Sequence, residues 1–177
     1  RLARVMARFD DHVDHVIVHT GQNWDYELNE VFFEDLGVRK PDHFLGVGGG
    51  SLGETLGGIL TATEKVLVQE KPDAVVVLGD TNSAISAIMA LRLMMPAYHI
   101  EAGNGRFNLN TPEEANRRLV SYSAEFNLVY TKHAGRPVLI ESQEYCMINK
   151  PQCVLNLIPG NARLPIAWFD IRASDLI

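Results

Sequence analysis

Three acidic side chains occupy positions from which they could move protons on a bound substrate. Asp80 follows the apolar run 74–78, and Glu101 follows the apolar run 97–100. Glu113 stands at the start of the helical segment after the next loop. Ligands of open parallel sheets bind beyond the carboxyl ends of the strands, so we expect these carboxylates to meet at one edge. Like charges held close raise at least one pKa, and carboxylates in different environments can divide acid and base duties.

Each carboxylate also has a structural explanation. An Asp after a strand often caps the next helix, and a Glu in a first turn complements the helix dipole. Ser51 with Glu54, and Thr111 with Glu114, both fit the capping box at a helix start. We therefore expect Glu114 to close the cap with Thr111, so that Glu113 is the residue facing a site.

The basic residues and histidines leave alternatives open. For Arg117 and Arg118 a surface ion pair is the favoured interpretation, and neutralisation of a nearby carboxylate or a substrate phosphate by one of them is the alternative. His19 and His99 fall within predicted strands, which indicates satisfied core histidines; a hydrogen bond from His99 to a neighbouring carboxylate is the weaker alternative. The remaining histidines lack metal-ligand spacing, so no metal site is predicted. They are His12, His15, His43 and His133.

A glycine-rich stretch precedes one predicted helix. Gly48, Gly50 and Gly53 formally satisfy the dinucleotide-binding fingerprint. Residues 40–43 precede it where an apolar strand should stand, and the lysine of a P-loop is absent. We interpret the stretch as a flexible loop before a capped helix, with contact to a phosphate as the lesser alternative.

The elements that must position these groups alternate between two patterns. Short runs rich in Val and Ile predict strands, and longer segments of helical period predict helices. This alternation predicts an α/β fold with a Rossmann-like parallel sheet covered by helices on both faces. The apolar run 166–169 has no evident place in it, and we expect it to pack against something outside the chain. Strands are predicted at 15–19, 74–78, 97–100, 127–130 and 153–157, and helices near 2–9, 27–36, 52–70, 83–93, 113–124 and 134–142.

Composition excludes several classes of function. The chain has 177 residues, of which 46% are hydrophobic and 21% charged, which fits one ordinary domain. A net charge of -6 without a basic face argues against nucleic acid as a partner. The two cysteines, Cys146 and Cys153, are too few for a disulfide framework or a zinc site and favour the cytoplasm. The sequence shows neither a bilayer-spanning run nor a signal peptide, so no membrane contact is expected.

Three stretches together resemble one family of enzymes. In their order and spacing they resemble the non-hydrolysing UDP-N-acetylglucosamine 2-epimerases, bacterial enzymes of surface-polysaccharide precursor synthesis. Residues 19–29 and 101–104 are more similar to the branch that makes UDP-N-acetyl-L-fucosamine. The resemblance runs from Arg1 to about Leu139. The stretches are Gly79-Asp80-Thr81, His99-Ile100-Glu101-Ala102-Gly103 and Pro112-Glu113-Glu114-Ala115-Asn116-Arg117.

The resemblance implies a fold, a reaction and site residues. It implies two Rossmann-like domains facing each other across a cleft, the GT-B arrangement, in a homodimer that uses no metal or nicotinamide cofactor. The implied reaction eliminates UDP from a UDP-N-acetyl amino sugar, as in converting UDP-GlcNAc to UDP-ManNAc, and adds it back with carbon 2 inverted. By resemblance, the catalytic acid/base carboxylates are Asp80, Glu101 and Glu113. The implied substrate-binding residues are Arg1, Gln22, Thr81, Asn104 and Arg117.

The sequence also departs from the family. The first strand and its turn, expected just before Arg1, are absent, and Gly105 and Arg106 stand where the family usually has Arg directly after Asn104. We expect residues 1–165 to form the N-terminal domain without its first strand, and 166–177 to begin an interdomain linker without the second domain. We therefore expect negligible turnover by this chain alone.

Two other functions fit parts of the sequence. One is a non-catalytic module, derived from such an enzyme, that binds a nucleotide sugar or dimerises; Gly105 and the divergent end favour it. The other is an oxidoreductase that uses the loop at Gly48 for a dinucleotide, against which the missing preceding strand argues. The identity of the UDP-sugar is not fixed by these residues.

Overall fold

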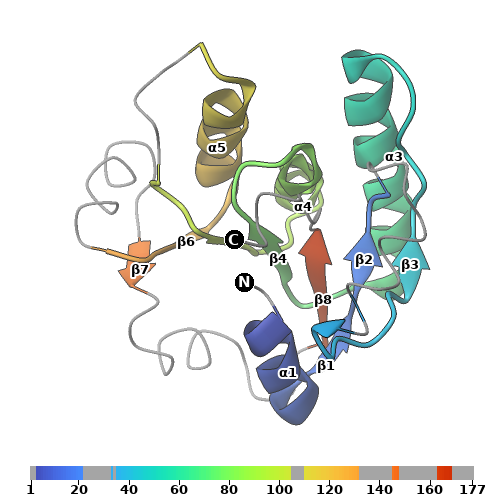
Figure 1. Cartoon of the computed structure of the whole chain (residues 1–177), viewed down its shortest axis with the longest axis vertical. Helices are drawn as coiled ribbons and strands as arrows, with labels where there is room; N and C mark the ends of the chain where they lie inside the picture. Colours follow the sequence, from blue (N-terminus) through green and yellow to red (C-terminus); the bar gives the residue numbers. More distant parts are fainter. Residues whose placement is uncertain are drawn as a thin grey trace.

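A parallel β-sheet forms the centre of the protein (Figure 1). The computed structural model describes residues 3–21, 33, 35–104 and 110–131, and the backbone of 145–147 and 163–168. Within them the sheet order is β1-β8-β4-β5-β6-β7, every pair is parallel, and β2 and β3 form a separate parallel pair. The strands are β1 (Asp14–Val16), β2 (Val18–His19), β3 (His43–Phe44), β4 (Val75–Leu78), β5 (Ala97–Ile100), β6 (Phe126–Val129), β7 (Tyr145–Met147) and β8 (Arg163–Trp168).

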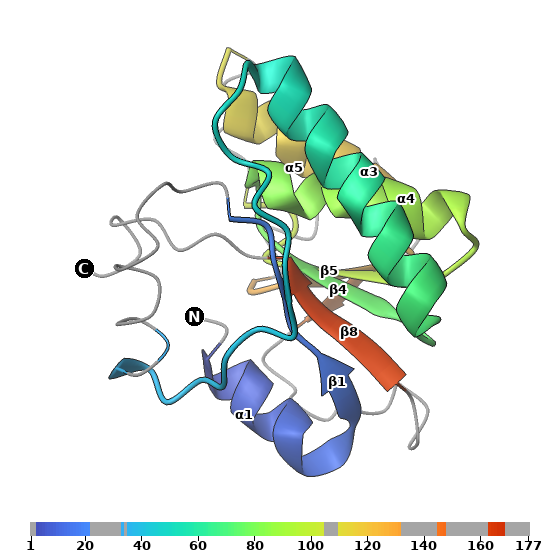
Figure 2. The same ribbon diagram turned by 90° about the vertical axis from the view of Figure 1, so that its right-hand side faces the viewer.

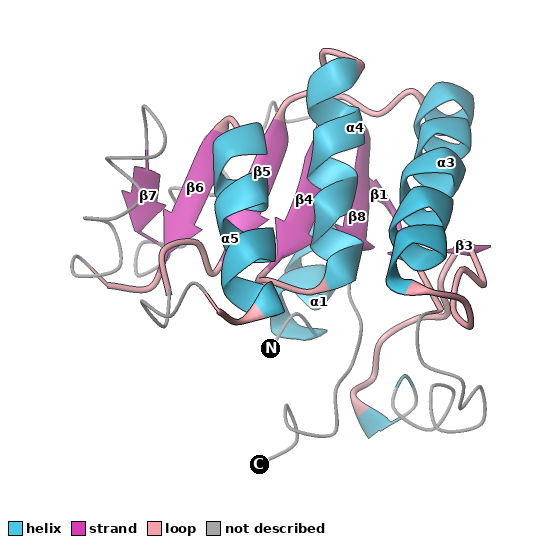
Figure 3. Cartoon of the chain, turned by 90° about the horizontal axis from the view of Figure 1, so that it is seen from above, coloured by secondary structure: helices cyan, strands magenta, loops and turns pink. Residues whose placement is uncertain are grey.

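Helices cover both faces of this sheet (Figures 2 and 3). Helix α1 (Ala3–His12) lies on one face. On the other lie α3 (Leu52–Glu70), α4 (Ala87–Arg92), which continues the 3₁₀ helix η1 (Asn82–Ser86), and α5 (Pro112–Ser123). The predicted α/β, Rossmann-like parallel sheet is therefore confirmed. In the described part of the chain, no helix is long and apolar enough to cross a bilayer.

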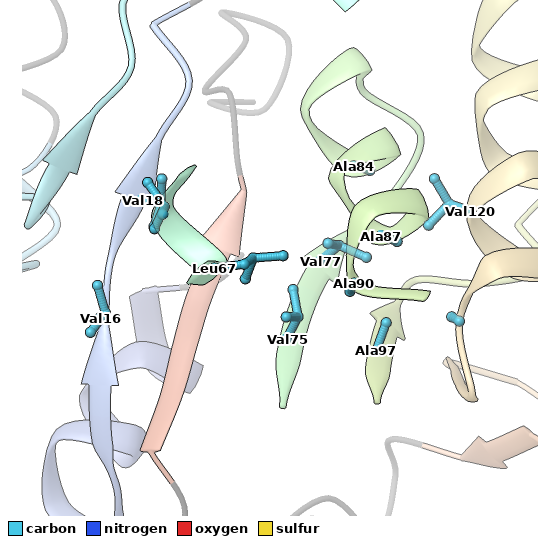
Figure 4. Close-up of a cluster of buried hydrophobic side chains, with 12 residues drawn as sticks. Val16, Val18, Leu67, Val75, Val77, Ala84, Ala87, Ala90, Ala97 and Val120 are labelled. Carbon is cyan, nitrogen blue, oxygen red and sulfur yellow. The ribbon is translucent and has the colours of Figure 1, made fainter. Parts of the chain in front are cut away.

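The core consists of two apolar clusters, one on each side of the sheet. Val75 and Val77 of β4 face the layer of α3, α4 and α5 (Figure 4), while Ala74 and Val76 join the cluster under α1. All four are at most 2% exposed. Full burial of a valine contributes about 1.5–3 kcal/mol, so this strand anchors both layers. The uninterrupted apolar run 74–78 is the pattern expected of a strand buried on both faces.

Several predicted elements match the structure and others differ. The helix predicted at 52–70 and the strand predicted at 97–100 coincide with α3 and β5. The strand predicted at 15–19 is divided at Ile17, because the Ile17 amide donates to Asp42 Oδ2 at 2.7 Å and the Ile17 carbonyl accepts from the amides of Asp42 and His43. The segments predicted at 134–142 and 153–157, and most of the helix predicted at 27–36, lie outside the described residues.

Strands β3, β7 and β8 were not predicted. Strand β3 precedes the glycine-rich stretch, where the sequence showed no strand, although it is only two residues long. Strand β8 lies between β1 and β4 and spans the domain boundary expected at residue 165. The expectation that the run 166–169 packs outside the chain is therefore wrong for residues 166–168. Pro165, which cannot donate a ladder hydrogen bond, pairs with Val16 in this strand.

One of the two expected capping boxes is present. At the start of α3, Glu54 N donates to Ser51 Oγ (3.2 Å) and Ser51 N donates to Glu54 Oε2 (2.7 Å). At the start of α5 the Thr111 side chain makes no capping hydrogen bond. The expected partner, Glu114, is buried and instead pairs with Arg118 Nε at 3.2 Å, so the second capping box is wrong.

Candidate functional site

Asp80 and Glu101 leave neighbouring strands at the same edge of the sheet. In the pairing of β4 with β5, Leu78 stands opposite Ile100, and the Gly79 amide donates to the Ile100 carbonyl at 2.8 Å. Glu101 has a φ of 69°, in the left-handed region that costs a non-glycine residue energy. Its amide is held by the Leu128 carbonyl of β6 at 3.0 Å. The chain therefore turns sharply after both strands and presents both acidic residues at this edge.

Arg117 of α5 joins the two turns. Its Nη2 donates to Asp80 Oδ2 at 2.6 Å, and its Nη1 donates to the Glu101 carbonyl oxygen. Arg117 is 7% exposed, whereas Arg118 is exposed and pairs with Glu114 within the helix. Of the alternatives left by the sequence, Arg117 thus neutralises a nearby carboxylate, and the exposed Arg118 makes an ion pair with the buried Glu114.

Asn116 reinforces the same turn, and sequence reasoning missed it. Its Nδ2 donates to the Asp80 carbonyl oxygen (3.1 Å) and to Asn82 Oδ1 (2.9 Å). The only signal in the sequence was its place beside Arg117 in the third motif. Thr81 begins η1 without a side-chain capping bond. Its Oγ1 is buried and has no hydrogen-bond partner among the described residues.

The other predicted site residues are not all gathered at this edge in the described part of the chain. Glu113 is half-buried in the first turn of α5, one turn before Arg117 and on the same side of the helix. Asn104 is exposed in the segment after Glu101. Arg1 and Gln22 lie outside the described residues. The described part thus brings Asp80, Glu101 and Arg117 together and places Glu113 one helical turn away.

Two histidines lie next to this edge, and the prediction that both are buried in the core is confirmed. His99 and His19 are both 0% exposed, and burial lowers the pKa of each to about 4. The alternative prediction, a hydrogen bond from His99 to a carboxylate, is wrong. Its Nε2 instead lies 2.8 Å from the Gly79 carbonyl oxygen. His19 stacks on Phe44 with ring centroids 5.3 Å apart. In the described part, no group of three or more His, Cys, Asp or Glu could hold a metal ion.

The glycine-rich stretch lies against the end of β2. The Val47 amide donates to the Thr20 carbonyl at 3.0 Å, and Thr20 Oγ1 is 2.7 Å from Ser83 Oγ of η1. Gly21 has a φ of 71°, and a Cβ there would be 2.7 Å from the Phe44 ring. The ends of β2, β4 and β5 therefore form a polar edge with acidic groups and a buried guanidinium. The carboxylates at this edge can exchange protons with a polar ligand.

Comparisons with known proteins agree with this geometry. A family described as UDP-N-acetylglucosamine 2-epimerase matches residues 7–149. Over 120 residues the chain is 44% identical to a UDP-2,3-diacetamido-2,3-dideoxy-D-glucuronate 2-epimerase of Pseudomonas aeruginosa, covering 67% of this chain and 34% of that protein. Over 126 residues it is 42% identical to a UDP-N-acetylglucosamine 2-epimerase of Methanococcus maripaludis, covering 71% of this chain and 34% of that protein.

Solved structures show the same fold. The Methanocaldococcus jannaschii UDP-GlcNAc 2-epimerase, in complex with UDP-GlcNAc and UDP, superposes with a TM-score of 0.76 at 33% identity, covering 83% of this chain and 42% of that chain. The Rickettsia bellii UDP-N-acetylglucosamine 2-epimerase superposes with a TM-score of 0.72 at 40% identity, covering 93% of this chain and 40% of that chain. The fold is thus the Rossmann-like half of a GT-B-type architecture. The chain spans about a third of the length of the relatives that it matches.

Proposed function

The chain belongs to the UDP-N-acetylglucosamine 2-epimerase family, and from this premise we propose that it is part of an enzyme that inverts carbon 2 of a UDP-N-acetyl amino sugar. The observation that carries the proposal is Arg117, which bonds both the Asp80 carboxylate and the Glu101 carbonyl. Through it the three motif stretches meet at one sheet edge. The names of the relatives support the substrate class, because both describe 2-epimerases of UDP-linked acetamido sugars.

The proposed reaction needs acidic groups and charge stabilisation. A base removes the weakly acidic proton at carbon 2 as UDP leaves from carbon 1, and a double bond forms between the two carbons. A proton then returns to carbon 2 from the opposite face as UDP bonds again to carbon 1. We assign the acid and base roles to Asp80, Glu101 and Glu113. The leaving diphosphate requires positive charge and hydrogen-bond donors. We assign the substrate contacts to Arg1, Gln22, Thr81, Asn104 and Arg117. We assign the protein to the cytoplasm, where a soluble UDP-sugar would be available.

A fusion protein tests this function. The chain would replace the matched part of the Methanococcus maripaludis relative, which supplies the rest of the enzyme. We expect the fusion to invert carbon 2 of UDP-GlcNAc and to exchange the carbon 2 proton for deuterium in D₂O, observed by NMR. We expect the chain alone to show neither.

The same fusion separates the proposal from its alternative. A folded fusion that binds UDP-GlcNAc by calorimetry but neither inverts nor exchanges carbon 2 would favour the non-catalytic module and contradict the catalytic proposal. The matched control is the unmodified relative, assayed beside the fusion under the same conditions.

We also propose that the protein is a homodimer, joined at the far end of the sheet from Asp80. Leu91, Met94 and Tyr122 form an exposed apolar patch there, and Met94 is 89% exposed. Leu91, Met94 and Tyr122 also line a hollow of about 250 Å³ beside the start of β5. Exposed apolar patches of this kind mark association sites.

Two charges at the border of the patch favour a second copy as its partner. Arg92 ends α4 and Glu125 precedes β6, and both are exposed. A two-fold axis that passes between these two residues would bring Arg92 of each copy towards Glu125 of the other. This arrangement leaves the edge that carries Asp80 open to substrate.

Substituting Met94→Asp is expected to give a monomer, because a carboxylate would be buried in the interface. Light scattering coupled to gel filtration should give twice the chain mass of 19.7 kDa for the unsubstituted protein and the single chain mass for the variant. Leu52→Asp, an exposed leucine at the start of α3, is the matched control and should remain dimeric. A monomeric unsubstituted chain would refute this surface as a dimer interface.

A further inference from the structure

A buried polar connection runs from α5 to the turn that carries Asp80. His99 lies in β5 and is 0% exposed. Its Nε2 is 2.8 Å from the Gly79 carbonyl oxygen, and its Nδ1 is 3.2 Å from Ser121 Oγ of α5. Gly79 immediately precedes Asp80, so this one ring links the helix to the point where the chain turns towards the site.

The partners of the ring determine which nitrogen carries the proton. A carbonyl oxygen only accepts hydrogen bonds, so Nε2 must donate to Gly79. In a neutral ring Nδ1 then accepts, and the Ser121 hydroxyl can donate to it. Asn127 Oδ1 also lies 3.3 Å from Nδ1, but an amide oxygen cannot donate, and the Asn127 amide nitrogen donates to the Ser121 carbonyl at 3.0 Å. The Gly79 carbonyl therefore selects the tautomer of His99, and Ser121 supplies the donor for the unprotonated Nδ1.

Burial keeps the ring neutral. Loss of hydration lowers the pKa of His99 to about 4, with the nearby Arg117 guanidinium acting in the same direction. The bond to Gly79, the Asn127 side chain and the Asp80 carboxylate act in the opposite direction without overcoming burial. A neutral imidazole can both donate to Gly79 and accept from Ser121, whereas an imidazolium could not accept.

Helix α5 thus holds the Asp80 turn at three points. Arg117 bonds the Asp80 carboxylate, Asn116 bonds the Asp80 carbonyl, and Ser121 reaches the Gly79 carbonyl through His99. Arg117 and Ser121 are four residues apart and share one side of the helix. Of these three connections, only the third runs through an intermediate side chain, that of His99.

We propose that His99 is a positioning residue for Asp80, acting as a neutral ring whose Nε2 donates to the Gly79 carbonyl and whose Nδ1 accepts from Ser121. By fixing the Gly79 carbonyl, it sets the direction in which Asp80 leaves β4. This inference rests on the catalytic role proposed for Asp80, because a positioning residue needs a reacting group to position. A misplacement of about 1 Å can lower turnover by about 100-fold, which is the scale of effect at stake.

The tautomer can be measured on the unsubstituted chain. With ¹⁵N-labelled histidine, we expect NMR to show His99 as a neutral ring that is protonated on Nε2 from pH 8 to pH 5. Ser121→Ala should shift the Nδ1 resonance, because that nitrogen loses its donor. A ring protonated on Nδ1, or charged within this range, would overturn the inference. This measurement involves no turnover, so its failure would leave the proposed function standing.

A pair of substitutions tests the positioning role. The amide nitrogen of Gln can occupy the place of Nε2, whereas that of Asn reaches only the place of Nδ1. In the fusion protein we expect His99→Gln to keep kcat within about threefold and His99→Asn to lower it about 10- to 100-fold, with a smaller change in KM. Equal losses of kcat in both variants would refute positioning through Nε2.

Hydrogen exchange provides a second readout that is independent of activity. The Gly79 amide donates to the Ile100 carbonyl, so its exchange rate reports on the order of the turn. We expect this rate to rise about tenfold in His99→Asn and to change little in His99→Gln. If both variants exchange alike at matched global stability, His99 does not position the turn. An inactive fusion would leave this result intact, so failure of the two proposals can be told apart.

Discussion

Replacing Glu101 by Gln is expected to lower the turnover of the fusion protein about 10²- to 10⁴-fold while leaving its stability nearly unchanged. Two contacts that hold the turn come from the Glu101 backbone, because its amide donates to the Leu128 carbonyl and its carbonyl accepts from Arg117. Gln has the same shape and keeps these contacts, but it cannot take or give the proton at carbon 2. We therefore expect less than about 0.5 kcal/mol of change in the free energy of unfolding.

The matched control is Glu64→Gln, an exposed residue of α3. It should keep full turnover. Asp80→Asn should behave differently from Glu101→Gln, because it also removes the charge paired with the buried Arg117, and it should lower both turnover and stability. If Glu101→Gln retained more than a tenth of the turnover, Glu101 would not be an acid or base in this reaction.

The second large effect concerns acid stability. Burial lowers the pKa of both His19 and His99 to about 4 from 6.5. Between these values the unfolded chain binds more protons than the folded chain, so the free energy of unfolding must fall as the pH falls from 6.5 to 4. For each histidine, the difference between a pKa of 6.5 and one of about 4 corresponds to about 3 kcal/mol at the end of this range. His15, whose pKa is lowered by burial and by Arg39, adds to the same trend.

Urea unfolding at a series of pH values between 7 and 4.5 checks this prediction. His99→Gln removes one titrating group and should flatten the dependence on pH, whatever its effect on stability at pH 7. Leu52→Gln, at an exposed position that carries no titrating group, should leave the slope unchanged. A slope that is equal in the unsubstituted chain and in His99→Gln would show that His99 does not titrate as a buried neutral group.

Local patterns were enough to predict the framework of the fold. The apolar run of β4 indicated a strand buried on both faces, and helical period together with the Ser51 capping box located α3 at its observed ends. The candidate carboxylates were found because Asp80 and Glu101 each follow directly on a buried strand. These features depend on residues close together in the sequence, and both the hydrogen bonds of helices and the two-residue alternation of strands are local.

Contacts between distant residues could not be predicted in this way. Arg117 and Asp80 are 37 residues apart, and nothing in either motif distinguished Arg117 from Arg118 as the partner of Asp80. Thr111 and Glu114 satisfied the capping pattern, yet the packing of α5 buries Glu114 and changes its partner. Strand β8 has a weak local pattern and a proline, and it takes its place only through pairing with β1 and β4.

The sequence by itself therefore determined the class of fold, the order of most strands and helices, and the acidic residues at the edge of the sheet. The tertiary structure alone decided that a buried guanidinium faces Asp80, that His99 bonds a carbonyl oxygen, and that Asn116 and Ser121 support the same turn. The physical reason is that polar side chains take the partners that folding brings within about 3 Å, and these lie far apart along the chain.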